Sequence, residues 1–421
     1  MNKKSKTRIK SFAATGSIIF FFIMAFEVLI MISPFAFFFY SVFNPVFAWF
    51  DKYPATNWLT GFFLPHMILP PTLPLKVVRI LGSVFFVVGA VSFIICAAQV
   101  YGGKIFKWGV AGKGLYKYIR HPQYFSLGVW GIGMCILWPR FIVLVSLSIM
   151  FIIYYFLARD EEQRMLTQYG ESYGSYLRNT GMFVPRFFEK RFAFIRNVIP
   201  NTSIRFVTIP ALIVIIVLGS GFVLRTVTLN SLSLESKANL TLVSILPEDN
   251  YLSTNVLNGI LGSDAGLQGE KDYLGYVMPG DYIMQGMIAD TGDNFHLYKK
   301  HHSIAMITEW VLHPFSHLRA SPALHMAKMH NVDPVFARRH HCPMGIDDPN
   351  LDCKTCPYRR IIIVEVKHKT SNHLSGKQLF AFDTVRIPVE AIDLDTRTGQ
   401  IVKVTKVKNS TAWENVPTPS I

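Results

Sequence analysis

The chain has 421 residues, 51% of them hydrophobic, and a formal net charge of +15. Residues 1–225 hold 23 Lys or Arg against 7 Asp or Glu, whereas the rest of the chain holds 19 against 20. The basic residues flank apolar segments and form no aromatic-interleaved stripe of the kind that binds single strands, so nucleic acid is not an expected partner. We predict two parts: an α-helical integral membrane domain over 1–225, and a soluble α+β domain over 226–421.

The membrane part contains several segments long enough to cross a hydrocarbon core of ~30 Å, which needs about 20 helical residues. The clearest are 16–43, 77–100 and 206–224. The first is too long for a cleaved signal peptide, and we interpret it as a retained anchor. Residues 124–157 predict a tight helical hairpin that turns at Trp138-Pro139-Arg140. Together these segments predict about five transmembrane helices.

The positions of Lys and Arg predict the orientation, because these residues are enriched in cytoplasmic loops. Eighteen of them fall on one side if the hairpin returns to the side from which it started, and five fall on the other. We expect an integral protein of the cell membrane with a cytoplasmic N-terminus. The tail after Arg225 is then extracytoplasmic.

Two polar clusters bracket the hairpin. Arg120, His121, Pro122 and Tyr124 precede it, and the acidic run Asp160-Glu161-Glu162 follows it. Ionisable groups at membrane edges are functional candidates. Taken singly, Arg120 also fits a positive-inside anchor, and the Glu161-Glu162 pair also fits a solvated helix end.

Their joint spacing resembles the isoprenylcysteine carboxyl methyltransferase group of integral-membrane methyltransferases, which also includes phospholipid and thiol methyltransferases. The resemblance covers about 75 residues, 114–188, and rests on these positions: Gly114 to Tyr124, Glu161-Glu162, Leu166, Tyr169-Gly170, Tyr173, Tyr176 and Val184-Pro185. Leu115 stands where the family commonly has Pro.

The resemblance implies methyl transfer from S-adenosylmethionine, bound at the cytoplasmic face. Position by position, His121, Tyr124, Glu161 and Glu162 are the cofactor-binding candidates. Arg120, Glu162 and Arg164 are the catalytic candidates. The residue types suit this cofactor, since carboxylates match its ammonium and hydroxyl groups, and His or Arg donors match its carboxylate. The expected partners are membrane lipid and a methyl acceptor that is lipid-like, prenylated, or a small thiol or carboxylate.

The tail contains a second chemical pattern. Residues 360–366 predict a strand, 384–394 and 400–408 predict a hairpin, and 301–330 predict helix. Between the predicted helical region 301–330 and the predicted strand 360–366 lie four residues that could form a Cys3His zinc site: His341, Cys342, Cys353 and Cys356. An extracytoplasmic location also permits a disulfide with one thiol left over, or unpaired cysteines.

Two functions of different classes follow from these patterns. The first is a membrane methyltransferase that uses S-adenosylmethionine and carries an accessory outer domain. The second is a membrane-anchored metal- or redox-binding protein with a degenerate methyltransferase-like scaffold.

Overall fold

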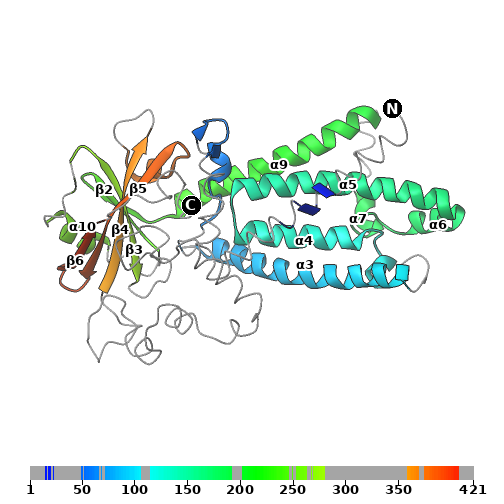
Figure 1. Cartoon of the computed structure of the whole chain (residues 1–421), viewed down its shortest axis with the longest axis horizontal. Helices are drawn as coiled ribbons and strands as arrows, with labels where there is room; N and C mark the ends of the chain where they lie inside the picture. Colours follow the sequence, from blue (N-terminus) through cyan, green and yellow to red (C-terminus); the bar gives the residue numbers. More distant parts are fainter. Residues whose placement is uncertain are drawn as a thin grey trace, which may run out of the picture. The chain divides into compact units, whose positions relative to one another are not determined.

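The computed structural model describes residues 49–50, 52–65, 68, 72–105, 114–191, 202–245, 249, 253–262, 267, 269–279, 358–368 and 374–406, with five positions between 15 and 22. The chain divides into two compact units (Figure 1). Unit 1 comprises Met1–Val28 and Pro74–Arg225, and unit 2 comprises Leu29–Leu73 and Thr226–Ile421.

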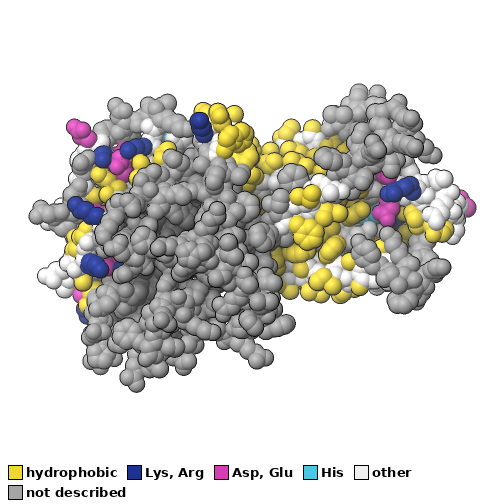
Figure 2. All heavy atoms as spheres, in the orientation of Figure 1, with side chains coloured by type: hydrophobic (Ala, Val, Ile, Leu, Met, Phe, Trp, Pro, Cys, Tyr) yellow, Lys and Arg dark blue, Asp and Glu magenta, His cyan; other side chains and the backbone are white. Residues whose placement is uncertain are grey.

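Unit 1 is helical. Its long helices are α3 (Leu73–Ile105), α4 (Pro122–Leu137), α5 (Phe141–Tyr169) and α9 (Thr202–Ser231). Shorter elements are η2 (Gly114–Lys117), α6 (Glu171–Asn179) and α7 (Arg186–Arg191). Figure 2 shows hydrophobic side chains along the described surface of this unit, and charged side chains near its α6 end.

The predicted hairpin is confirmed, because α4 ends at Leu137 and α5 begins at Phe141. Among the described residues, three helical segments are long and apolar enough to cross a membrane: Leu73–Val100, Phe141–Tyr169 and Thr208–Ser231. Helix α4 has 16 residues and is shorter than such a span. The first expected span, 16–43, lies almost wholly outside the described residues, so the total of about five spans stays a prediction.

Helices α3 and α4 pack closely through glycine. A Cβ at Gly89 would lie 2.3 Å from the Trp130 nitrogen, and a Cβ at Gly133 would lie 2.3 Å from the Phe86 nitrogen. Small residues allow this approach of two backbones, which is a common way to join helices in lipid. The glycines of α3 and α4 therefore hold these two helices in close contact.

Unit 2 contains a six-stranded sheet in the order β1-β2-β3-β4-β5-β6. The strands are β1 (Leu234–Lys237), β2 (Leu240–Ser244), β3 (Asp272–Pro279), β4 (Tyr358–His368), β5 (Thr384–Asp395) and β6 (Ile401–Lys406). Strands β2 and β3 are parallel and joined through α10 (Ser253–Leu261), and all other neighbours are antiparallel. The predicted strand at 360–366 and the predicted hairpin are confirmed as β4, β5 and β6, whereas 301–330 lies outside the described residues.

Both faces of the sheet are covered. On one face, Val256, Leu257 and Ile260 of α10 join buried strand residues. On the other face, Ile68 and Leu232 join a core that includes Phe380 of η6 (Gly376–Phe380). Segments flanking the membrane helices therefore contribute to the core of unit 2. The short helix η1 (Asn57–Thr60) also belongs to this unit, and nearby the Thr228 hydroxyl donates to the Phe63 carbonyl at 3.3 Å.

Candidate active site

The loop before α4 is held by backbone hydrogen bonds to the segment that follows α6. The Arg120 N–H donates to the Gly181 carbonyl at 2.8 Å, and the His121 N–H donates to the Met182 carbonyl at 3.1 Å. Pro122 then begins α4, where a missing N–H costs no helical hydrogen bond. These contacts fix the backbone of the first motif against α6 and the chain beyond it.

The acidic cluster lies inside α5, because this helix continues to Tyr169 rather than ending near residue 157. Arg120 Nε lies 2.5 Å from Glu162 Oε1. His121 Nε2 lies 3.3 Å from the same oxygen, and His121 Nδ1 lies 3.6 Å from Glu161 Oε2. The structure thus brings together four of the predicted residues from two motifs separated by the hairpin.

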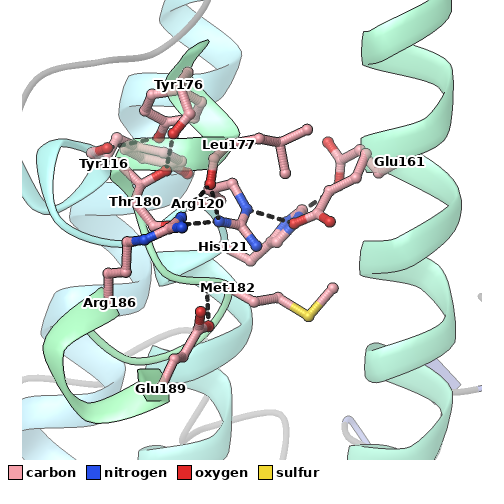
Figure 3. A network of polar contacts seen from close by, with 11 residues as sticks. Tyr116, Arg120, His121, Glu161, Tyr176, Leu177, Thr180, Met182, Arg186 and Glu189 are labelled. Carbon is pink, nitrogen blue, oxygen red and sulfur yellow. Dashed lines mark hydrogen bonds and ion pairs between the residues drawn. The ribbon is translucent and has the colours of Figure 1, made fainter. Parts of the chain in front are cut away.

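The two glutamates differ in their surroundings. The Glu162 side chain is only 13% exposed and is engaged by both Arg120 and His121. The Glu161 side chain is 42% exposed, and its Oε2 lies 3.6 Å from His121 Nδ1. Figure 3 shows Glu161 on its helix facing the loop that carries His121 and Arg120. The Glu162 carboxylate is therefore occupied by contacts within the protein, whereas the Glu161 carboxylate is accessible to a ligand.

Arg120 connects three elements. Besides Glu162 on α5, its Nη1 donates to the Leu177 carbonyl at 3.1 Å and to the Thr180 carbonyl. These carbonyls lie at the C-terminal end of α6, where backbone acceptors lack helical partners and the helix dipole favours a cation. The Arg120 side chain is 8% exposed, so its guanidinium is largely used in holding α5 and α6 to the motif loop.

His121 is buried among aromatic rings. Its ring stacks on Tyr124 with 5.6 Å between centroids, and Tyr124 in turn stacks on Tyr154 at 4.9 Å. Phe183 approaches His121 at 6.0 Å. The side chain is 3% exposed, and among the described residues neither ring nitrogen finds a hydrogen bond of favourable geometry. A buried imidazole with this arrangement has hydrogen-bonding capacity left for a ligand.

A matching family covers this region. Residues 104–167 match the isoprenylcysteine carboxyl methyltransferase (ICMT) family. No curated protein and no solved structure matches the chain. The ICMT match contains both polar motifs and the hairpin between them, and it supports a membrane methyltransferase of the isoprenylcysteine type for this part of the chain.

The ICMT match ends before α6, yet residues beyond it complete the site. The Tyr176 hydroxyl donates to the Tyr116 carbonyl at 2.6 Å, and Arg186 Nη1 donates to the Leu177 carbonyl at 3.0 Å. The Glu189 carboxylate accepts from the Met182 N–H. Burial raises the pKa of Tyr176, so its hydroxyl stays protonated as a donor. Sequence reasoning did not identify Arg186 or Glu189, although the neighbouring Val184-Pro185 marked this segment.

Arg164 is placed differently from the other predicted residues. Its Nε lies 3.2 Å from Asp160 Oδ2 one helical turn away, and its side chain is 71% exposed. The structure does not bring it into the Arg120–His121–Glu162 group. The four tail residues proposed as metal ligands, His341, Cys342, Cys353 and Cys356, lie outside the described residues. Within the described part of the chain, no group of three or more His, Cys, Asp or Glu residues could hold a metal ion.

Proposed function

We propose that the chain is a membrane methyltransferase that uses S-adenosylmethionine at the cytoplasmic face. The observation that supports this most strongly is the meeting of Arg120 and His121 with Glu161 and Glu162, inside a region that matches the ICMT family. The acceptor is lipid-like or prenylated, or a small thiol or carboxylate. A lipid-like acceptor fits best with a site that lies at the end of apolar helices.

The residues fit the cofactor by their chemistry. Its ammonium and ribose hydroxyls need a carboxylate, and Glu161 offers one that is 42% exposed. Its carboxylate needs donors, and the buried His121 nitrogens make no well-formed hydrogen bond to the residues that the structure describes. Glu162 and Arg120 then act indirectly on the cofactor, because they hold each other and His121 in place. When bound, the cofactor supplies a methyl group activated by a positively charged sulfur.

The protein's own task in such a transfer is chiefly positioning and the exclusion of water. Alignment of a nucleophile with a bound donor contributes most of the acceleration in reactions of this kind. The Tyr124–Tyr154 stack and Phe183 surround His121 with rings that keep water away from one side of the site. A cationic donor reacts more readily when its surroundings are dry.

Equilibrium binding of radiolabelled S-adenosylmethionine to the purified full chain tests this proposal. We expect binding by the wild type, and a strong loss in Glu161→Gln and His121→Ala. Lys367→Gln is the control, because Lys367 pairs with Glu365 on β4 of unit 2, is 57% exposed, and should leave binding unchanged. Absence of binding by the wild type would refute the proposed methyltransferase function.

The acceptor is identified separately, by methyl incorporation into membrane lipid, prenylcysteine and thiol pools. The competing reading, a metal- or redox-binding protein, is tested by metal analysis of the full chain and its Cys353→Ser variant. The metal- or redox-binding hypothesis would be supported if the wild type bound metal but not S-adenosylmethionine.

A further inference from the structure

Helix α7 has its polar and apolar side chains in an unusual orientation. Its Arg186 and Glu189 face the protein, where they bind the Leu177 carbonyl and the Met182 N–H. Its Phe187 and Phe188 face outward and are 65% and 54% exposed. A helix that faces water normally buries its aromatic side chains and exposes its charges. The reversed arrangement is the one expected where the surroundings of the helix are apolar.

The depth of α7 along unit 1 suits the edge of a bilayer. Glu161 lies about 30 Å along α5 from Phe141 at the hairpin turn, at a rise of 1.5 Å per residue, and this equals the thickness of a hydrocarbon core. Helix α7 shares this level, because Met182 accepts from the His121 N–H and donates to Glu189. Lys190 and Arg191 follow the two phenylalanines and are exposed. Aromatic and basic residues together are typical of the membrane interface.

We infer that Phe187 and Phe188 insert into the bilayer interface on the side of the site, and that this contact holds residues 177–189 against the first motif. We call residues 177–189 the cover segment. The partner is the lipid bilayer itself, with Lys190 and Arg191 placed to meet anionic headgroups.

The route from lipid to site consists of contacts in the structure. Anchoring of α7 by its phenylalanines fixes Arg186 and Glu189, which hold Leu177 and Met182 of the cover segment. Met182 in turn accepts from the His121 N–H, and Leu177 shares its carbonyl between Arg186 and Arg120. Arg186 and Glu189 are thus positioning residues, and this second half of the inference rests on the proposed function.

Lipid contact is tested first, without reference to any activity. The full chain is placed in vesicles of phosphatidylcholine and phosphatidylglycerol, with the photoreactive amino acid benzoylphenylalanine replacing Phe187, Phe188 or, as an exposed control in β6, Val402. We expect lipid adducts at the two α7 positions and few at the control. Protein adducts in place of lipid adducts at α7, or equal yields at Val402, would overturn the inference.

Coupling to the site is tested by cofactor affinity in the same vesicles. Replacing both phenylalanines with Ser should weaken S-adenosylmethionine binding by about tenfold, which corresponds to about 1.4 kcal/mol. Replacing both with Leu keeps an apolar anchor and should preserve the wild-type affinity. Arg186→Gln should weaken binding even with the phenylalanines intact. Wild-type affinity in the Ser variant refutes the coupling, whereas failure of the wild type to bind refutes the proposed function and leaves the lipid-contact result standing.

Discussion

The two adjacent glutamates of α5 should differ in how much the same substitution lowers stability. Replacing Glu162 with Gln removes the charge that faces Arg120 Nε at 2.5 Å, while leaving the shape of the side chain nearly unchanged. Both partners are largely buried, at 8% and 13% exposure. Removing one member of a buried ion pair typically costs about 3–5 kcal/mol, because the other charge is left without compensation.

The cost should fall toward the lower end of that range. Arg120 keeps its hydrogen bonds to the Leu177 and Thr180 carbonyls, which still compensate part of its charge. We therefore expect Glu162→Gln to lose roughly 3 kcal/mol of stability. Binding of S-adenosylmethionine should weaken as well, since His121 loses its neighbour at 3.3 Å.

Glu161→Gln should leave stability almost unchanged and still abolish most of the binding. Its side chain is 42% exposed, and its contact to His121 Nδ1 spans 3.6 Å. Exposed substitutions of this kind usually change stability by less than about 0.5 kcal/mol. The loss of affinity then reflects a missing ligand contact rather than a distorted protein.

Thermal unfolding in detergent and calorimetric titration with S-adenosylmethionine measure the two effects on the same samples. The reasoning is refuted if Glu161→Gln binds like the wild type, or if Glu162→Gln unfolds like the wild type. A double-mutant cycle with Arg120→Gln separates the pair itself from the orphaned charge, and we expect each substitution to cost less once the other is present.

Three further predictions concern packing and pH. Gly133→Ala should destabilise the helical unit by about 1–3 kcal/mol in thermal unfolding, because the new Cβ would meet backbone of α3, whereas Gly219→Ala, with open space around it, should not. Burial raises the pKa of Tyr176, so the folded state holds that proton more tightly, and stability should fall as pH rises above the ordinary tyrosine pKa of about 10. This alkaline loss should be smaller in Tyr176→Phe, and an unchanged pH profile would contradict it. Hydrogen bonds from Arg397 lower the pKa of Asp395, so stability should be full above an ordinary aspartate pKa of about 3.9 and decline as pH falls through the lowered value. Arg397→Met should flatten this acid decline in denaturation monitored from pH 6 downward, and an equally steep decline would count against the assignment.

The sequence carried enough information to predict the hairpin and the meeting of the two motifs. Apolar residues interrupted only at Trp138-Pro139-Arg140 leave the chain one place to turn, and a turn there returns Glu161 and Glu162 to the level of Arg120. Strands β4, β5 and β6 were predictable for a similar reason. Runs of β-branched residues joined through Asp395 to Gly399 leave few other structures for that segment.

The different roles of Glu161 and Glu162 could not be read from their adjacency. Successive residues of a helix point about 100° apart, so only the packing of α5 decides which carboxylate meets Arg120. The role of Arg120 could not be predicted either, because it binds the end of α6 through two backbone carbonyls. Backbone acceptors carry no sequence signal, and the charge of an arginine does not reveal whether it faces a substrate or a helix end.

The packing inside unit 1 also bears on which faces of the membrane its two ends reach. Gly82 contacts Ile136, and Phe141 lies 4.6 Å from Phe222, so the start of α3, the hairpin turn and the last part of α9 share one end. At the other end, the Tyr116 hydroxyl contacts the Cys96 carbonyl beside the motif loop. The chain leaves unit 1 after Arg225, at the end away from the site.

If these helices cross the membrane, the site and the tail emerge on opposite faces whichever face is cytoplasmic. The excess of Lys and Arg around the motifs favours the cytoplasm for the site. Protease added outside intact cells should then cut the tail while the motif loops stay protected, and cleavage of the motif loops with protection of the tail would reverse the orientation.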